Sequence, residues 1–372
     1  MTISIKGMTK RFGQTEVLRG IDLTIEKGEL VALLGPSGSG KTTLLKIIAG
    51  LEWPGGGALE VDGTDWLRLR AQDRRIGFVF QSYALFPNMT VRDNIAFGLT
   101  VRPRAERPGR NAIAGKVDHL LELLQIAHLG DRFPAQLSGG QRQRVALGRA
   151  LAIEPTVLLL DEPFGALDAA IRRDLRAWLR EVHNQTGSTT IFVTHDQEEA
   201  FELADRVVVM GNGRIEQIGD ADQIHDHPAS PFVARFMGAT IELPATLRAG
   251  RIEAPGLDAS RLERRALPDG PAQLFLRPED ITLIPDHLGC WTITEMASTG
   301  TVLRIQVRND QDHRIEVVMP RRAPESAQLA IGLATHLRAE AGSVFAQARS
   351  RAEKPGIALH SEQSTSVKET SL

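Results

Sequence analysis

The segment GPSGSGKTT, residues 35–43, constrains this chain more than any other feature. It matches the pattern G-x-x-x-x-G-K-[ST], follows the apolar run Val31–Leu34 and precedes the apolar helical run LLKIIAG. A glycine-rich turn between a strand and a helix lets backbone N–H groups surround phosphate oxygens, while Lys41 reaches the outer phosphates and Thr42 can ligate Mg²⁺. The predicted phosphate loop consists of Gly35, Pro36, Ser37, Gly38, Ser39, Gly40, Lys41, Thr42 and Thr43. An ordinary glycine-rich turn is the alternative, and the flanking strand and helix argue against it.

Short apolar runs alternate with helical patterns through about residue 235, which predicts an α/β fold with a parallel sheet. Four of the runs end in a polar or glycine-rich turn: Val31–Leu34 before Gly35, Ile76–Phe80 before Gln81, Val157–Leu160 before Asp161, and Thr190–Thr194 before His195. Ligands of open α/β sheets collect at the carboxyl ends of the strands. We therefore expect these four ends to share one site.

A mainly helical stretch at about residues 88–152 interrupts this alternation and predicts an inserted helical subdomain. Its clearest helical spacing joins Val117, Leu120, Leu121 and Leu124, with Gly130 as the expected stop. The same spacing recurs at Leu175, Trp178, Leu179 and Val182. Trp178 is therefore expected in the core.

The pattern changes near residues 236–244, beyond which short alternating segments lie between turns rich in Pro, Gly and Asp. These segments include Gln273–Phe275, Thr301–Val307 and Ile315–Val318. We expect domains at 1–238 and 239–360, the second β-rich, followed by a polar disordered tail at 361–372.

The charge balance and the cysteine content limit the functions and the cellular compartments that are expected for this chain. The chain has 44 Lys+Arg and 46 Asp+Glu, a net charge of −2, so it carries no overall electrostatic footprint for nucleic acid. Its single cysteine, Cys290, fits a reducing compartment. The start MTISIKGMTKRFG lacks the features of a secretory signal, and no apolar run is long enough to span a bilayer. We expect a protein that stays in the cytoplasm.

The run VLLLDEP places two carboxylates at a strand end. There Asp161 can hold Mg²⁺ through water, and Glu162 can position an attacking water. Taken alone, Asp161 could equally be a helix N-cap and Glu162 a solvated charge. The phosphate loop upstream favours the catalytic interpretation.

The run LSGGQRQR predicts a helix start, because Ser138 can cap and Gln141 can reach back to complete a capping box. A helix N-terminus containing Gly139 and Gly140 is also suited to bind an anion. The chain therefore carries two candidate phosphate-binding elements.

Six motifs taken in order closely resemble the ATP-binding subunits of ABC transporters: GPSGSGKTT, Gln81 after a strand, LSGGQ, VLLLDEP, ALD at 166–168, and His195 in VTHD. The resemblance implies a P-loop NTPase domain of the ABC ATPase type that hydrolyses ATP to drive transport. It implies a homodimer that sandwiches two ATP molecules, with Ser138, Gly139, Gly140 and Gln141 of one copy facing the phosphate loop of the other.

The resemblance also implies a role for each remaining candidate. Glu162 polarises the hydrolytic water, with Lys41 and His195 on the γ-phosphate. Thr42, Asp161 and Gln81 serve Mg²⁺, and Asp168 lines the dimer seam. Phe12 stands where the family stacks an aromatic on adenine; packing against an edge strand is the alternative.

The β-rich extension and its LFLRPEDI run, Leu274–Ile281, resemble importer ATPases with an OB-like regulatory domain, most closely those of sulfate/thiosulfate importers. That resemblance implies two integral-membrane permease subunits, a periplasmic or extracellular solute-binding protein, and a peripheral location on the cytoplasmic face of the inner membrane. The run QSYALF, Gln81–Phe86, stands where the family docks the membrane subunits, and we expect exposed aromatics there. A packed loop is the alternative.

Other functions stay open. The same machine could carry ferric iron, molybdate, a polyamine or a sugar. A soluble ABC-type ATPase acting on DNA or ribosomes is disfavoured because the chain has one phosphate loop and no long heptad insertion. A P-loop kinase is disfavoured by LSGGQ.

Overall fold

The computed structural model describes residues 1–165, 169–262 and 267–347. The first part of the chain contains two sheets. An antiparallel sheet has the order β2-β1-β4-β5 and a mainly parallel sheet has the order β10-β9-β3-β8-β7-β6. The antiparallel sheet is built from β1 (Ile3–Phe12), β2 (Thr15–Ile25), β4 (Gly56–Val61) and β5 (Thr64–Asp65). The parallel sheet is built from β3 (Leu30–Leu34), β6 (Ile76–Val79), β7 (Val157–Asp161), β8 (Thr189–Thr194), β9 (Arg206–Gly211) and the antiparallel edge strand β10 (Arg214–Gly219).

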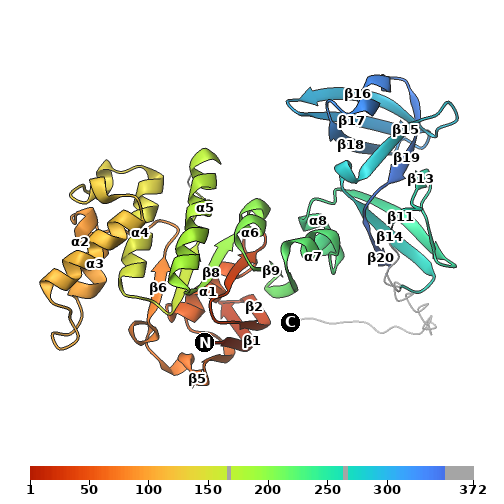
Figure 1. The fold of residues 1–372 in the computed structure, drawn as a ribbon. Helices are drawn as coiled ribbons and strands as arrows, with labels where there is room; N and C mark the ends of the chain where they lie inside the picture. The colour runs from red at the N-terminus through yellow and green to blue at the C-terminus, as the bar shows by residue number, and fades with distance from the viewer. Residues whose placement is uncertain (166–168, 263–266, 348–372) are drawn as a thin grey trace, which may run out of the picture.

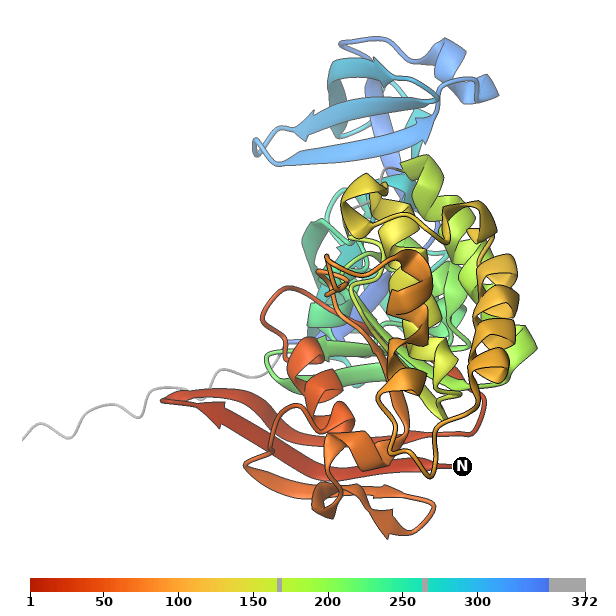
Figure 2. The same ribbon diagram turned by 90° about the vertical axis from the view of Figure 1, so that its left-hand side faces the viewer.

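The parallel sheet is covered on both faces, which is why β3, β7 and β8 are apolar or buried throughout. Alternate residues of β3 enter different cores. Val31 and Leu33 pack with helix α1 (Lys41–Ala49) and the antiparallel sheet, whereas Ala32 and Leu34 pack with the helices of the opposite face. Figure 2 shows α1 directly above the long β1–β2 ribbon. This arrangement fixes α1, and with it the phosphate loop, between the two sheets.

Three helices lie between β6 and β7 and gather to one side of the sheet (Figure 1). They are α2 (Val91–Thr100), α3 (Arg110–Leu123) and α4 (Gly139–Ala152). The side chain of Thr90 caps α2, and Ser138 caps α4. The expected stop at Gly130 is wrong, because α3 ends at Leu123 and the chain turns at Gln125, which has a φ of 56°. Gly130 follows the next short 3₁₀ turn.

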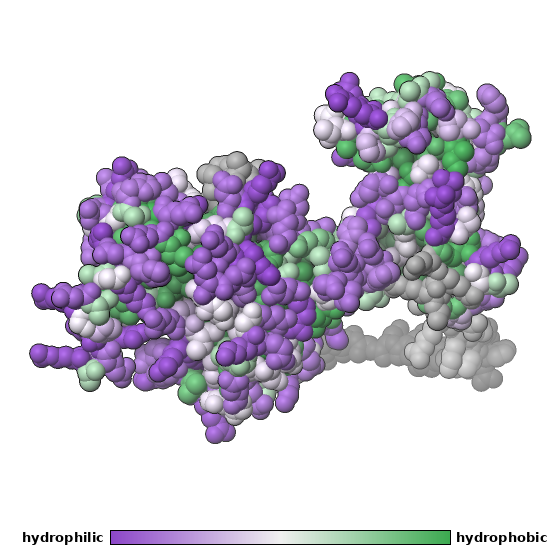
Figure 3. All heavy atoms as spheres, in the orientation of Figure 1, coloured by the Kyte–Doolittle hydropathy of each residue, from purple (hydrophilic) through white to green (hydrophobic). Residues whose placement is uncertain are grey.

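The remaining helices follow β7, β8 and β10: α5 (Ala169–Thr186), α6 (Gln197–Leu203), and then α7 (Ala221–Asp226) and α8 (Pro231–Phe236). Trp178 on α5 is 6% exposed and belongs to the core, as predicted. Hydrophilic residues cover most of the face in Figure 3. No helix of the described residues is long and apolar enough to cross a membrane.

From Ile241 the chain folds into β strands with a core of their own. One sheet has the order β12-β11-β14-β20, and β13, β19, β16, β17 and β18 form another, with β15 beside β19. The strands are β11 (Ile241–Arg248), β12 (Arg251–Glu253), β13 (Leu257–Asp258), β14 (Gly270–Leu276), β15 (Ile281–Pro285), β16 (Trp291–Thr299), β17 (Val302–Asn309), β18 (Arg314–Pro320), β19 (Ala334–Ala339) and β20 (Ser343–Ala346). Arg277 in LFLRPEDI connects this region to the first, because its guanidinium donates to the carbonyls of Met237, at 2.9 Å, and His225.

Candidate functional site

The predicted strand ends lie side by side. Strands β3, β8, β7 and β6 are parallel neighbours in that order. Their carboxyl ends therefore lie along one edge of the sheet, and the segments that follow them carry the phosphate loop, His195, the Asp161–Glu162 pair and Gln81. The four ends are therefore neighbours, and the expectation that they share one site stays a prediction.

The phosphate loop depends on two glycines. A Cβ on Gly35 would lie 2.2 Å from the carbonyl oxygen of Met210, so only glycine fits there. Gly40 is the N-cap residue of α1 and has a φ of 100°, and no side chain caps the helix. The first-turn N–H groups of α1 are therefore available to an anion.

Lys41 is buried inside its own loop. Its Nζ donates to the carbonyl oxygens of Gly35, at 2.7 Å, and Pro36, at 2.9 Å, and the residue is 5% exposed. Burial lowers the pKa of Lys41, against the opposing attraction of Glu162 and Asp161. Lys41 Nζ also donates to the Ser39 hydroxyl at 3.5 Å. A buried ammonium held by these neutral oxygens is well placed to take a phosphate as its partner.

The carboxylate of Asp161 faces the same loop. It accepts a hydrogen bond of 2.7 Å from Thr42 Oγ1, and the residue is 6% exposed. Burial raises the pKa of Asp161, although the hydrogen bond from Thr42 opposes the shift. Asp161 is the last residue of β7, so the N-cap alternative is wrong. A carboxylate and a hydroxyl in contact provide the oxygen ligands that a hard cation such as Mg²⁺ prefers, and the buried carboxylate would gain from its charge.

Glu162 occupies a strained position. Its φ is 47°, and its backbone N–H donates to the carbonyl of Val193 on β8 at 3.2 Å. One carboxylate oxygen accepts a hydrogen bond of 2.7 Å from Gln81 Nε2, and the other lies 3.8 Å from His195 Nδ1. The Val193 carbonyl on β8 therefore holds the backbone of Glu162, and Gln81 holds its side chain, which is 24% exposed. The catalytic role of Glu162 stays a prediction beside the solvated-charge alternative.

Hydrogen bonds and an ion pair hold the turn that carries His195. Thr194 Oγ1 donates to the carboxylate of Glu199 and accepts from the N–H of Asp196 at 3.0 Å. Arg172 on α5 adds an ion pair of 3.3 Å with Asp196. Sequence reasoning missed Glu199, which is 5% exposed. The available signal was its helical spacing with the buried residues Ala200 and Leu203.

The LSGGQ segment forms the predicted helix start. Ser138 Oγ accepts from the N–H of Gln141 at 3.3 Å, and Gln141 Oε1 accepts from the N–H of Ser138 at 2.9 Å. Gly139 and Gly140 form the first turn of α4. No hydrogen bond or ion pair among the described residues joins Ser138–Gln141 to the phosphate loop. Asp168, in ALD, lies outside the described residues.

Phe12 and the aromatic residues of Gln81–Phe86 differ in how far they are exposed. Phe12 ends β1, is 47% exposed and has Lys10 Nζ 4.7 Å from its ring centre, so its face is not packed into a core. The expectation of exposed aromatics in Gln81–Phe86 is wrong. Tyr83 is 7% exposed, and Phe86 is half-buried against Phe97 at a centroid distance of 4.3 Å. The two aromatic side chains of this segment are therefore packed, although Gln81, Ser82 and Ala84 are exposed.

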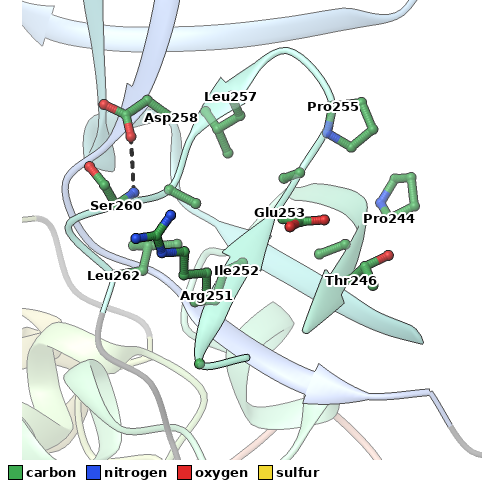
Figure 4. A pocket seen from close by; sticks show the side chains of 14 residues that line it. Pro244, Thr246, Arg251, Ile252, Glu253, Pro255, Leu257, Asp258, Ser260 and Leu262 are labelled. Carbon is green, nitrogen blue, oxygen red and sulfur yellow. Dashed lines mark hydrogen bonds between the residues drawn. The ribbon is translucent and has the colours of Figure 1, made fainter. Parts of the chain in front are cut away.

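A cavity away from these residues lies in the β-rich region (Figure 4). It has a volume of about 880 Å³ and lies between β11, β12 and the segment after β13. Asp258 accepts a hydrogen bond of 3.0 Å from the N–H of Ser260 at its rim. None of the predicted site residues lines this cavity.

Comparison with known proteins identifies the architecture. A family model described as ABC transporter matches residues 18–165. The sulfate/thiosulfate import ATP-binding protein CysA of Brucella melitensis is 51% identical over 327 residues, which are 87% of this chain and 91% of that protein. This chain belongs to the ABC transporter family. The protein of the same name from Escherichia coli K12 is 58% identical to this ABC protein over 283 residues, 76% of this chain and 77% of that one.

A solved structure supports the same assignment. The ATP-binding cassette MJ0796, a dimer in a post-hydrolysis state bound to ADP and Pi, superposes with a TM-score of 0.54 at 32% identity. The match covers 59% of this chain and 98% of that one. The predicted fold class, an ABC ATPase domain followed by a β-rich region, is confirmed, and this ABC protein binds ATP as the ATPase subunit of a transporter.

Proposed function

We propose that this ABC ATPase drives the import of sulfate and thiosulfate. The hydrolytic part of the proposal depends on one observation: the Glu162 carboxylate is held between Gln81 and His195 at the strand edge that carries the phosphate loop. The cargo rests on the names of the relatives, which are sulfate/thiosulfate import proteins at 51% and 58% identity.

In this proposal ATP lies on the phosphate loop with its adenine on the exposed face of Phe12. Lys41 turns from its own carbonyls to the outer phosphates. Thr42, Asp161 and Gln81 would hold Mg²⁺, which when bound would neutralise phosphate charge. Glu162 orients the attacking water and accepts its proton, and His195 donates to the γ-phosphate.

Two copies of the chain form the active unit. The separation of Ser138–Gln141 from the phosphate loop of the same chain supports this, because the second phosphate-binding element then has no ligand within one copy. The solved relative described as dimeric agrees. Helix α4 of one copy would direct its first-turn N–H groups at the ATP of the other.

The partners are two permease subunits in the inner membrane and an external solute-binding protein, with this chain on the cytoplasmic face. Ser82 and Ala84, which are exposed in the Gln81–Phe86 segment, offer the membrane subunits a backbone surface rather than an aromatic anchor. We further propose that the ATPase domain spans 1–238 and that an OB-like regulatory domain spans 239–360.

Uptake of labelled sulfate tests the proposal in cells that lack this chain and are complemented with wild type or Glu162→Gln. We expect only wild type to restore uptake. If neither restores it although both proteins are expressed and bound to membranes, the sulfate assignment is wrong, and iron or molybdate uptake becomes the next measurement. Equal restoration by both variants would contradict the role of Glu162.

A further inference from the structure

Arg149 links helix α4 to the segment that carries Gln81. It lies 11 residues, about three helical turns, beyond Ser138. Its guanidinium donates to the carbonyl of Ala84 at 2.7 Å and to that of Tyr83 at 3.0 Å, and its centre lies 5.3 Å from the Phe86 ring centre. Arg149 on α4 therefore holds the neighbouring loop in two ways: its guanidinium donates to two loop carbonyls, and it lies over the Phe86 ring.

This arrangement is electrostatically unusual. Among the described residues no carboxylate forms an ion pair with Arg149, and its only hydrogen bonds go to those two carbonyls. Burial lowers the pKa of Arg149 and nothing offsets the shift. Arg149 is partly exposed, and the contacts that stabilise its cation among the described residues all come from this loop, so the position of the guanidinium is tied to the position of the loop.

The loop itself needs support. Tyr83 and Ala84 are consecutive residues with positive φ, 63° and 46°, a conformation that side chains with a Cβ disfavour. The far end is anchored by the buried Asn94 of α2, which accepts from the N–H of Phe86 at 2.9 Å and donates to the Phe86 carbonyl at 3.1 Å. Arg149 anchors the near end, two residues after Gln81.

We propose that Arg149 is a positioning residue for ATP hydrolysis: it holds Tyr83 and Ala84 so that Gln81 reaches Glu162. The proposal rests on the proposed function of Glu162. In this proposal helix α4, which Ser138 caps, helps to position the Glu162 carboxylate of the same copy. Released from Arg149, the strained pair would relax and carry Gln81 away from the 2.7 Å contact.

The first test measures ATP turnover of the full-length chain. Arg149→Met should lower kcat about tenfold or more, because a positioning error near 1 Å can cost up to about a hundredfold in rate. KM for ATP should change less than kcat, because Lys41 and the phosphate loop stay in place. Arg149→Lys keeps the positive charge but loses the planar guanidinium that donates to both carbonyls. Its kcat should therefore lie between that of wild type and that of Arg149→Met. Arg102→Met is the matched control: Arg102 also donates to a backbone carbonyl beside this helix, that of its C-cap residue Ile153, at 3.2 Å. Its kcat should stay within about twofold.

A double-mutant cycle separates positioning from general structural damage. If Arg149 acts through Gln81, adding Arg149→Met to Gln81→Ala should lower kcat no further. If the loss of kcat in the double variant equals the product of the losses in the two single variants, the proposal is wrong. If Arg149→Met does not fold, the same cycle with Arg149→Lys decides. Glu162→Gln is measured alongside, since full turnover in that variant would refute the proposed function itself rather than the role of Arg149.

Hydrogen exchange gives a readout that does not depend on activity. The N–H of Tyr83 donates to the Phe80 carbonyl at 2.8 Å near Arg149, whereas the N–H of Phe86 is held by Asn94. In Arg149→Lys the Tyr83 amide should exchange faster by about tenfold and the Phe86 amide should not. Unchanged exchange at Tyr83 would contradict the proposal.

Discussion

Replacing Arg74 with methionine should detach the far end of the helix that carries the phosphate loop. Arg74 is 3% exposed. Its Nη1 donates to the carbonyls of Ile47 and Ile48, both at 2.8 Å, at the end of α1, and its Nε and Nη2 donate to the Leu69 carbonyl. The guanidinium thus caps the negative end of the helix dipole.

The expected loss of unfolding free energy depends on which backbone carbonyls lose their only hydrogen-bond donor when Arg74 is replaced. The Ile47 carbonyl also accepts from the N–H of Gly50 at 3.0 Å, so it stays satisfied. Among the described residues, the Ile48 and Leu69 carbonyls have no hydrogen-bond donor besides Arg74. The buried Ile48 carbonyl, once unsatisfied, costs about 1–3 kcal/mol, and the part-buried Leu69 carbonyl costs less. Loss of the charge at the helix end adds about 0.3–1 kcal/mol. Since methionine retains much of the apolar packing, we expect Arg74→Met to lower the free energy of unfolding by about 3 kcal/mol.

Urea unfolding followed by tryptophan fluorescence measures this loss, because the buried Trp66 lies in the same core as α1. The midpoint should fall while the slope stays constant. Arg75→Met is the control, since Arg75 is exposed and should change stability by less than about 0.5 kcal/mol. A loss below about 1 kcal/mol for Arg74→Met, or equal losses for both variants, would refute the reasoning.

Three further predictions concern the site and the fold. Ser138→Arg should retain ATP binding, because Ser138 does not contact the phosphate loop of its own chain, yet lose turnover; unchanged turnover would remove LSGGQ from the mechanism. Gly35→Ala should lose ATP binding measured by equilibrium dialysis, because the new Cβ would lie 2.2 Å from the Met210 carbonyl oxygen; wild-type affinity would contradict this. Burial lowers the pKa of His183 below its ordinary 6.5, so the unfolded chain binds more protons and stability falls as pH drops below about 6.5. His183→Gln should flatten that slope in urea titrations at pH 5–7, and an identical slope would show that His183 does not contribute.

Local and periodic signals predicted the parts of the site that short-range physics determines. The capping box of Ser138 and Gln141 spans three residues, so its pattern was sufficient to predict it. The meeting of the four strand ends followed from the rule that parallel strands point the same way. Trp178 followed from helical spacing.

The rest depended on contacts that no local pattern encodes. Tyr83 appeared to be an exposed anchor, but its left-handed backbone and Arg149, 66 residues away, turn it inward. Arg149 itself lies in an unremarkable helical run. Gly130 was a reasonable helix stop by residue type, yet α3 ends at Leu123 before reaching it. The roles of Phe12 and His195 stay predictions that rest on the family resemblance.

The mass of the Glu162→Gln chain with saturating ATP and Mg²⁺ tests most directly the claim that two copies complete each ATP site. This variant should bind ATP and hardly hydrolyse it, so a closed pair should accumulate. Light scattering should then give twice the 40.7 kDa of one chain, and adding Ser138→Arg should abolish the ATP-dependent increase. The mass of a single chain at saturating ATP would contradict the account.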